Sequence, residues 1–138
     1  MKSKYGIVFL VGLLFSLSAC DPIVDPDGEE SDRDKFLGSW TCTEADRKVA
    51  AYEVVIYESV SVSNQVSITN FGLLGSEASP IASISGDNIT VASQYCCSDD
   101  SWHVEGDGVM TANDRMDWQY ELNDGSTLYQ VSAVYDKN

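Results

Sequence analysis

The chain has 138 residues, with 22 Asp and Glu against 8 Lys and Arg, and a net charge of −14. This length suits one small domain, and the acidic balance excludes the basic surface that nucleic-acid binding requires. Hydrophobic residues make up 43% of the chain and include seven Tyr, four Phe and three Trp. That content is too high for a disordered acidic chain and sufficient for a core. The composition therefore predicts a folded, acidic domain that does not bind nucleic acid.

The first twenty residues have the features of an export signal. Two lysines precede a run of twelve mostly apolar residues, 6–17, and small residues then lead to Cys20. A helix over that run would be about 18 Å long, shorter than the roughly 30 Å of a bilayer core. The sequence Leu-Ser-Ala-Cys ending at Cys20 resembles the lipobox of bacterial lipoproteins. We therefore expect residues 1–19 to be a signal peptide and Cys20 to be lipidated.

A lipidated Cys20 would make the mature protein membrane-anchored. An acylated N-terminal cysteine carries more than one fatty chain, whereas one chain alone binds only marginally. Cleavage would remove two lysines, leaving 6 basic and 22 acidic residues, a net charge of −16. Residues 20–35 hold seven acidic residues and two prolines, which predicts a flexible acidic tether. Such a segment after the cysteine resembles the surface-export signal of Bacteroidota lipoproteins, so we expect an outer-membrane protein on the cell surface or the periplasmic face.

From residue 36 onward, polar and apolar residues alternate, and turn residues interrupt the pattern every 8 to 12 positions. This pattern is typical of an all-β sandwich or barrel. Short turn sequences between the segments favour antiparallel neighbours. The expected strands are roughly 38–44, 51–58, 65–70, 80–85, 88–93, 101–110, 115–122 and 128–135. We predict a single antiparallel meander of about eight strands, closed as a β-barrel, with a β-sandwich as the alternative.

Residues 115–122 show the alternation most clearly. Met116, Trp118, Tyr120 and Leu122 share one face, while the charged residues share the other. The same parity places further apolar residues inside: Tyr52, Val54, Ile56, Val66, Ile68, Ile89, Val91, Trp102, Val104, Val131, Ala133 and Tyr135. Gly106 and Gly108 also fall at inward positions, where glycine indicates a bend or bulge.

Several motifs together resemble a known family. They are Phe36-Leu37-Gly38-Ser39-Trp40, Tyr52-Glu53-Val54, Val66 to Phe71, Ser85 to Val91 with Gln94, Val104-Glu105-Gly106-Asp107-Gly108 and Ala133-Val134-Tyr135-Asp136-Lys137. In order and spacing they are similar to the small lipocalin-like lipoproteins of Bacteroidota, over nearly all of residues 36–138. The resemblance implies a lipocalin-like barrel and no established activity. Many members pair cysteines between the first and last strands, whereas here Cys42 has the first position and the last strand has Gln130 near the position of the expected partner.

Three cysteines remain after Cys20, an odd number for an oxidising compartment. We expect a disulfide between Cys42 and Cys97, or Cys96 instead, whose loop of about 55 residues would add roughly 4 kcal/mol in the chain-entropy model. A bridge between the adjacent Cys96 and Cys97 is the rarer alternative. A zinc site that adds His103 lacks the usual ligand spacing, so neither a metal nor a cofactor is expected.

Catalytic signals are weak in this sequence. His103 is the single histidine and lies at an outward position, and no Gly-x-Ser-x-Gly or His-Glu-x-x-His motif occurs. A carboxylate-based hydrolase would need two acids about 5 to 10 Å apart in a cleft. The available pairs, Asp99 with Asp100 and Glu105 with Asp107, have the outward positions of ordinary surface acids. The sequence therefore predicts a protein that is not an enzyme.

Two functions from different classes fit these features. The first is a monomeric binding module whose barrel mouth accepts a small apolar molecule, a glycan or a peptide. Its expected interior lining is Trp40, Tyr52, Trp102, Trp118 and Tyr120. The alternative is an accessory protein with a solid core that docks a larger envelope partner through its acidic surface. An eight-stranded barrel is only just wide enough for its own side chains, and this limit supports the alternative.

Overall fold

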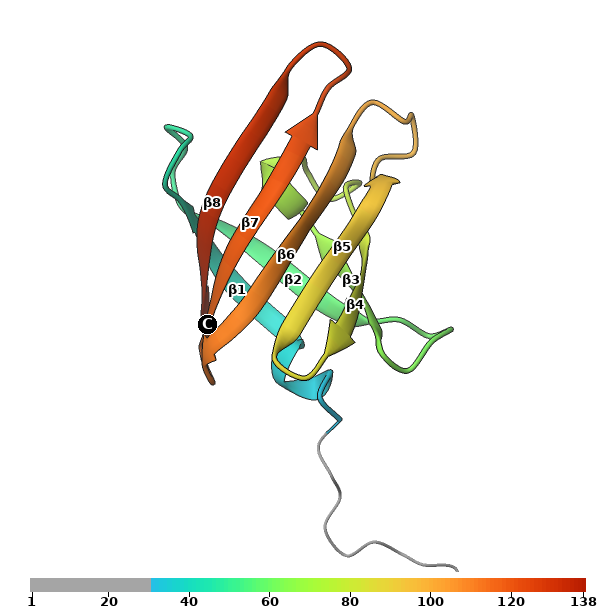
Figure 1. Cartoon of the computed structure of the whole chain (residues 1–138), viewed down its shortest axis with the longest axis vertical. Coiled ribbons are helices and arrows are strands. Elements are labelled where there is room, and N and C mark those ends of the chain that lie inside the picture. The colour runs from blue at the N-terminus through green and yellow to red at the C-terminus, as the bar shows by residue number, and fades with distance from the viewer. Residues whose placement is uncertain (1–30) are drawn as a thin grey trace, which may run out of the picture.

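The computed structural model describes residues 31–138, so the signal peptide, Cys20 and most of the predicted tether lie outside the described residues. Eight antiparallel strands form a closed barrel in chain order (Figure 1). They are β1 (Gly38–Glu44), β2 (Tyr52–Glu58), β3 (Gln65–Thr69), β4 (Ile81–Ser85), β5 (Asn88–Tyr95), β6 (His103–Ala112), β7 (Arg115–Asn123) and β8 (Leu128–Lys137). Pairing of β1 with β8 closes the barrel. The predicted barrel is confirmed, and the sandwich alternative is wrong.

Two short 3₁₀ turns, η1 (Asp34–Phe36) and η2 (Phe71–Leu73), accompany the strands. No helix in residues 31–138 is long and apolar enough to cross a bilayer. The strands match the expected segments to within about two residues at each end.

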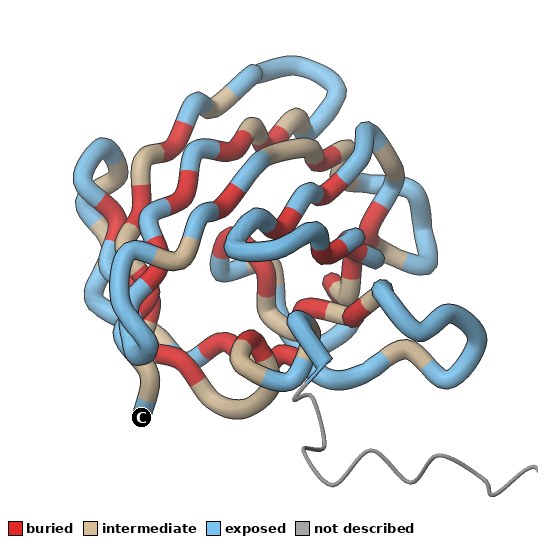
Figure 2. Tube along the Cα trace, turned by 60° about the horizontal axis from the view of Figure 1, so that its bottom comes forward, coloured by how far each residue is buried: buried red, intermediate tan, exposed pale blue. Residues whose placement is uncertain are grey.

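Buried residues alternate with more exposed ones along the strands (Figure 2). In β7, Met116, Trp118, Tyr120 and Leu122 are each at most 2% exposed. The alternation follows from strand geometry, in which successive side chains point to opposite faces. The inward face that the sequence assigned to residues 115–122 is therefore confirmed.

Two glycines in β6 let the large rings of β7 lie close to that strand. A Cβ atom on Gly106 would lie 2.4 Å from Cβ of Tyr120, and one on Gly108 would lie 2.6 Å from Cε2 of Trp118. These distances are too short for any side chain. The glycines thus provide room for the aromatic core. β6 pairs with β7 in regular register at both positions, so they do not mark the bend or bulge that the sequence suggested in that pairing.

The N-terminal segment packs against the barrel before β1 begins. Arg33 pairs with Glu58 at 2.9 Å, and Lys35 pairs with Asp87 at 2.6 Å. Phe36 is fully buried. The sequence placed the end of the flexible tether at residue 35, but residues 33–35 already contact the barrel.

The two ends of the barrel differ. We call the end with η1 and the turns 59–64, 86–87 and 113–114 the proximal end, and the end with connections 45–51, 70–80, 96–102 and 124–127 the distal end. Residue 31 and the C-terminus lie at the proximal end (Figure 1). The distal end is therefore the end farther from residue 31, where the described part of the chain begins.

Candidate functional site

The connection between β3 and β4 covers the distal end of the barrel. Phe71 of η2 is fully buried, and its ring centroid lies 4.7 Å from that of Tyr120 and 5.8 Å from that of Trp118. Gly72 (φ 63°) approaches Leu122 so closely that a Cβ atom would lie 2.8 Å from its side chain. The connection between β3 and β4 thus covers the core at the distal end of the barrel.

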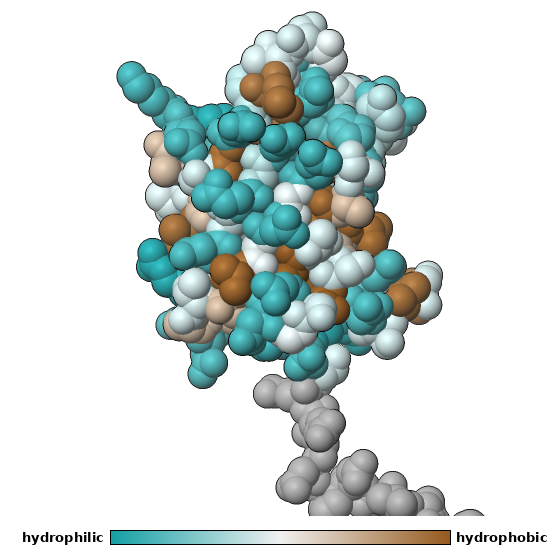
Figure 3. Space-filling model, viewed as in Figure 1, coloured by the Kyte–Doolittle hydropathy of each residue, from teal (hydrophilic) through white to brown (hydrophobic). Residues whose placement is uncertain are grey.

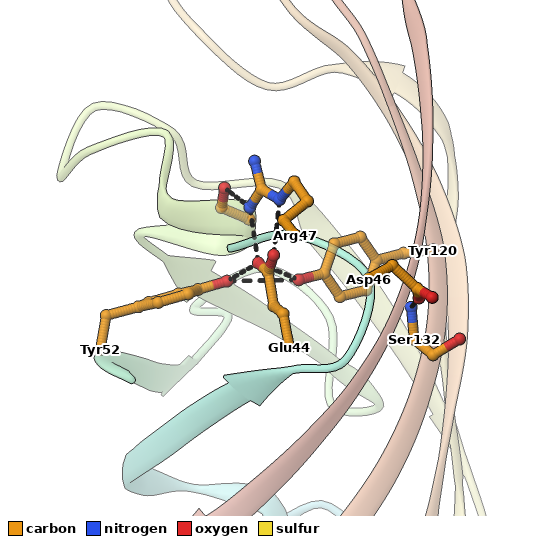
Figure 4. A network of polar contacts seen from close by, with 7 residues as sticks. Glu44, Asp46, Arg47, Tyr52, Tyr120 and Ser132 are labelled. Carbon is orange, nitrogen blue, oxygen red and sulfur yellow. Dashed lines mark hydrogen bonds and ion pairs between the residues drawn. The ribbon is translucent and has the colours of Figure 1, made fainter. Parts of the chain in front are cut away.

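Beneath the connection lies a buried carboxylate, Glu44, at the end of β1 (Figure 4). Its Oε1 accepts hydrogen bonds from the Tyr52 hydroxyl at 2.5 Å, the Tyr120 hydroxyl at 2.8 Å and Nη2 of Arg47 at 2.5 Å. Its Oε2 accepts one from Nε of Arg47 at 2.5 Å. Arg47 also donates to the carbonyl of Gly72 at 2.6 Å. The network joins β1, β2, β7 and η2.

The network fixes the charge states of its members. Burial alone would raise the pKa of Glu44, but hydrogen bonds from Arg47, Tyr52 and Tyr120 outweigh it and hold that pKa below its usual value. The hydrogen bond to Glu44 raises the pKa of Arg47. Glu44 and Arg47 are therefore both ionised at neutral pH. The Glu44 carboxylate accepts hydrogen bonds from Arg47, Tyr52 and Tyr120.

A thiol and a third tyrosine lie deeper in the interior. Burial raises the pKa of Cys42 to about 11, and it raises the pKa of Tyr135 well above the usual value. The Tyr135 hydroxyl and Nε1 of Trp118 are buried and have no hydrogen-bond partner among the described residues. Burial therefore keeps the Cys42 thiol and the Tyr135 phenol neutral at neutral pH, and the neutral forms are poor nucleophiles.

The cysteine positions correct one prediction. Cys42, Cys96 and Cys97 are free thiols in the structure, so the expected bridge from Cys42 to Cys97 or Cys96 is absent. Cys42 points into the interior from β1, whose neighbours are β2 and β8, whereas Cys96 and Cys97 follow β5 on another side of the barrel. The sulfur atoms of Cys96 and Cys97 instead lie 3.5 Å apart.

The five aromatic residues proposed to line a ligand cavity occupy the core. Trp40, Trp118 and Tyr120 are at most 2% exposed. Tyr52 and Trp102 are half-buried, and the Trp102 ring lies 6.1 Å from that of Tyr129. Trp40, Trp118 and Tyr120 belong to the buried core, and Tyr52 and Trp102 pack against it.

A pocket of about 470 Å³ lies on the outer face of β5 to β8. Its outward side chains are Ser93, Glu105, Asp107, Gln119, Glu121 and Gln130. Hydrophilic residues cover most of this face, with apolar residues between them (Figure 3). The one aromatic residue in the lining, Tyr120, is 2% exposed, so the pocket presents carboxylates and amides.

The strand register places two of these carboxylates directly opposite each other. Glu105 of β6 pairs with Glu121 of β7, and Glu121 in turn pairs with Gln130 of β8. Like charges directly opposite on neighbouring strands destabilise a sheet. None of the ion pairs found in residues 31–138 involves Glu105, Asp107 or Glu121. The pocket therefore holds three carboxylates without an ion-pair partner in the described part of the chain, of which Asp107 accepts a hydrogen bond from Thr90 at 2.7 Å and Glu121 one from Gln130 at 3.1 Å.

The sequence singled out Glu105 and Asp107, but it missed Glu121, Gln130 and the buried Glu44 with Arg47. The signal for Glu44 was available, because it has the same inward parity as Trp40 and Cys42 and is followed by an arginine three residues later. His103 faces outward, 3.2 Å from the Ser93 hydroxyl. Across residues 31–138, no group of three or more His, Cys, Asp or Glu side chains is arranged to hold a metal ion.

Comparisons with known proteins agree with the barrel architecture. A redesigned β-barrel, b11L5F_LGL, is similar in structure with a TM-score of 0.56 and 11% sequence identity, covering 78% of this chain and 96% of its own. EF1p2_mFAP2b, solved bound to DFHBI, has a TM-score of 0.49 and 9% identity, covering 78% of this chain and 99% of its own. No family model and no curated protein matches the sequence. The similarity to the redesigned barrel shows the fold.

Proposed function

We propose that the protein is a membrane-anchored lipoprotein of the bacterial cell envelope, of the lipocalin-like kind that its motifs resemble. In this proposal it is a non-enzymatic binding module that recognises a basic peptide segment of an envelope protein through the outer pocket on β5 to β8. The proposal rests on the Glu105–Glu121 pair. These two carboxylates lie directly opposite each other beside Asp107, and none of the three has an ion-pair partner in the described residues. A cationic segment would relieve this repulsion, and electrostatic complementarity of this kind selects partners.

The arrangement of the barrel supports an outward-facing site. The interior is occupied by aromatic side chains and closed at the distal end by η2 and the Glu44 network. The chain enters at the proximal end (Figure 1), so an anchor at Cys20 would leave the side of the barrel facing the surroundings. Glycan recognition is less well supported because the pocket has no exposed aromatic ring on which a sugar could stack.

The peptide proposal is tested by calorimetric titration with an oligolysine peptide. The triple variant Glu105→Gln, Asp107→Asn, Glu121→Gln should bind about tenfold more weakly, equivalent to about 1.4 kcal/mol. Binding by the wild type should weaken as salt is added, because salt screens exposed charges.

A matched control distinguishes binding at the pocket from attraction by the net negative charge of the protein. The triple variant Glu53→Gln, Glu77→Gln, Asp114→Asn removes the same charge from exposed residues outside the pocket. It should keep nearly all of the affinity of the wild type. Equal losses in both triple variants would show that only net charge matters, and would overturn the pocket as the site.

The anchor is tested separately by metabolic labelling with a fatty acid in a bacterial host. The wild type should incorporate the label and remain with the membrane fraction, and Cys20→Ala should do neither. Retention of the label in Cys20→Ala would refute lipidation at Cys20 without bearing on the pocket.

A second candidate function is binding of a small molecule inside the barrel. The observation in its favour is the pair of buried donors without partners, the Tyr135 hydroxyl and Nε1 of Trp118, since such groups normally find a partner. A hydrophobic fluorescent probe tests it. A saturable change in tryptophan emission would favour an interior ligand, whereas no change would leave the outer pocket as the single candidate.

A further inference from the structure

The two adjacent cysteines after β5 have converging side chains. The Sγ atoms of Cys96 and Cys97 lie 3.5 Å apart. Neighbouring side chains in an extended strand point to opposite faces, so convergence requires the chain to leave the strand between these two residues.

Hydrogen bonds fix the backbone in this geometry. The amide of Cys96 donates to the carbonyl of Trp102 at 3.1 Å, and the carbonyl of Cys96 accepts from the amide of Ser79 at 3.2 Å. The chain then turns at once, because the carbonyl of Cys97 accepts from the amide of Asp100 at 3.1 Å. Asp100 adopts a left-handed conformation with φ 54°. The residues that precede β4 and β6 thus hold Cys96, while the turn brings Cys97 to the same side.

The two thiols differ in accessibility. Cys96 is 9% exposed, whereas Cys97 is half-buried. Cys42 is fully buried inside the barrel. Both thiols of the pair lie in the distal connection 96–102, opposite the proximal end (Figure 1). A reagent from solution therefore meets Cys97 first, with Cys96 directly behind it.

Metal binding does not account for the pair. A structural zinc site has four protein ligands, and no third His, Cys, Asp or Glu side chain joins these thiols in a metal-binding arrangement within residues 31–138. Two facing thiols of unequal exposure are instead the arrangement required for thiol–disulfide exchange.

We propose that Cys96 and Cys97 are a redox-active dithiol that reacts with an external disulfide to form a vicinal disulfide. The thiolate of Cys97 attacks one sulfur of the external disulfide, forms a mixed disulfide and releases one thiol. The thiolate of Cys96 then attacks the Cys97 sulfur, forms the Cys96–Cys97 bond and releases the second thiol. The dithiol loses two electrons and two protons, which the external disulfide gains as two thiols.

The surroundings favour this order of events. Burial, and then the neighbouring Cys97, raise the pKa of Cys96 to about 12. Conversion of Cys97 to a mixed disulfide removes the influence of its thiol, which makes Cys96 easier to deprotonate. Adjacent Cα atoms are about 3.8 Å apart, below the usual minimum of about 4.4 Å for a disulfide. Disulfides with such geometry are readily reduced, so the reaction is reversible.

Glutathione buffers of increasing oxidised fraction test the proposal on the full mature protein extracted in detergent. Samples are acid-quenched, alkylated and digested, and the mass of the peptide that contains both cysteines is measured by mass spectrometry. In the wild type the doubly alkylated peptide should be replaced by an unlabelled form two hydrogens lighter than the dithiol, and dithiothreitol should reverse the change. Cys96→Ser should accumulate a glutathione adduct on Cys97.

Two further variants complete the test. Cys97→Ser should leave Cys96 without glutathione and open to alkylation after unfolding, and Cys42→Ser should behave as the wild type. The proposal is overturned if both wild-type thiols stay alkylatable in the most oxidising buffer, if the wild type stops at the glutathione adduct, or if Cys97 bonds to Cys42. The wild-type result decides the matter even where a serine variant fails to fold.

Discussion

At the scale of single residues, Glu44 is the most constrained polar group that the structure describes. A buried carboxylate is costly unless donors surround it, and Arg47, Tyr52 and Tyr120 supply four hydrogen bonds. Arg47 also donates a hydrogen bond to the carbonyl of Gly72, which links the charge pair to η2. The charge pair thereby holds η2 against the distal end and helps to keep the interior closed.

Replacement of this carboxylate should destabilise the barrel. Glu44→Gln leaves the guanidinium of Arg47 without its counter-charge, and we expect the free energy of unfolding to fall by about 2 to 4 kcal/mol. Urea unfolding followed by tryptophan fluorescence measures the loss. The exposed Glu53→Gln should change the stability by less than about 0.5 kcal/mol, and a similarly small effect of Glu44→Gln would contradict the structural role of the network.

Glu44 should also make the stability of the barrel depend on pH. The folded-state pKa of Glu44 lies below its ordinary value of 4.5, so its ionised form stabilises the fold fully above about pH 4.5. This contribution is lost as the pH falls through the lowered pKa. The stability difference between the wild type and Glu44→Gln should therefore be constant near neutral pH and shrink in acid. A difference that stays the same down to pH 3 would contradict the assignment.

At the scale of secondary-structure elements, β6 and β7 determine both the core and the outer pocket. Their register brings Glu105 opposite Glu121 on the outside and Gly106 opposite Tyr120 on the inside. The tight turn at residues 113–114 predicts that these strands pair. The sequence did not indicate which outward residues of β5 complete the pocket, because the pairing of β5 with β6 contains a bulge between Val91 and Gln94. β8 pairs with β7 in an unbroken register.

Gly106→Ala tests the close approach of these strands. The added methyl group would lie 2.4 Å from Cβ of Tyr120 and 2.7 Å from the carbonyl oxygen of Gln119. The backbone of β7 cannot move away without breaking its hydrogen bonds to β6. We expect a loss of about 2 to 3 kcal/mol in thermal or urea unfolding. Asp107→Ala, on the outward side of the same strand, should cost much less. Equal stability of the wild type and Gly106→Ala would show that β6 and β7 lie farther apart.

At the scale of the whole molecule, much of the architecture could be predicted from the chain. Alternation gave eight strands and their inward faces, since a period of two is local information. The covering by η2 and the convergence of Cys96 with Cys97 could not be predicted in this way, because they depend on contacts between distant segments or on turn geometry. The expected Cys42 bridge failed for this reason, because cysteine spacing does not reveal which side of a barrel each residue occupies.

The central claim is that the barrel interior is filled and that recognition occurs on the outer face. The most direct measurement is a residue-resolved NMR titration of the mature chain carrying Cys20→Ala with an oligolysine peptide. The account predicts chemical-shift changes at Glu105, Glu121 and Gln130, with Phe71 and Trp40, which lie in the core outside the pocket lining, largely unchanged. Changes concentrated at Phe71 and the distal end, or no saturable change at all, would contradict it.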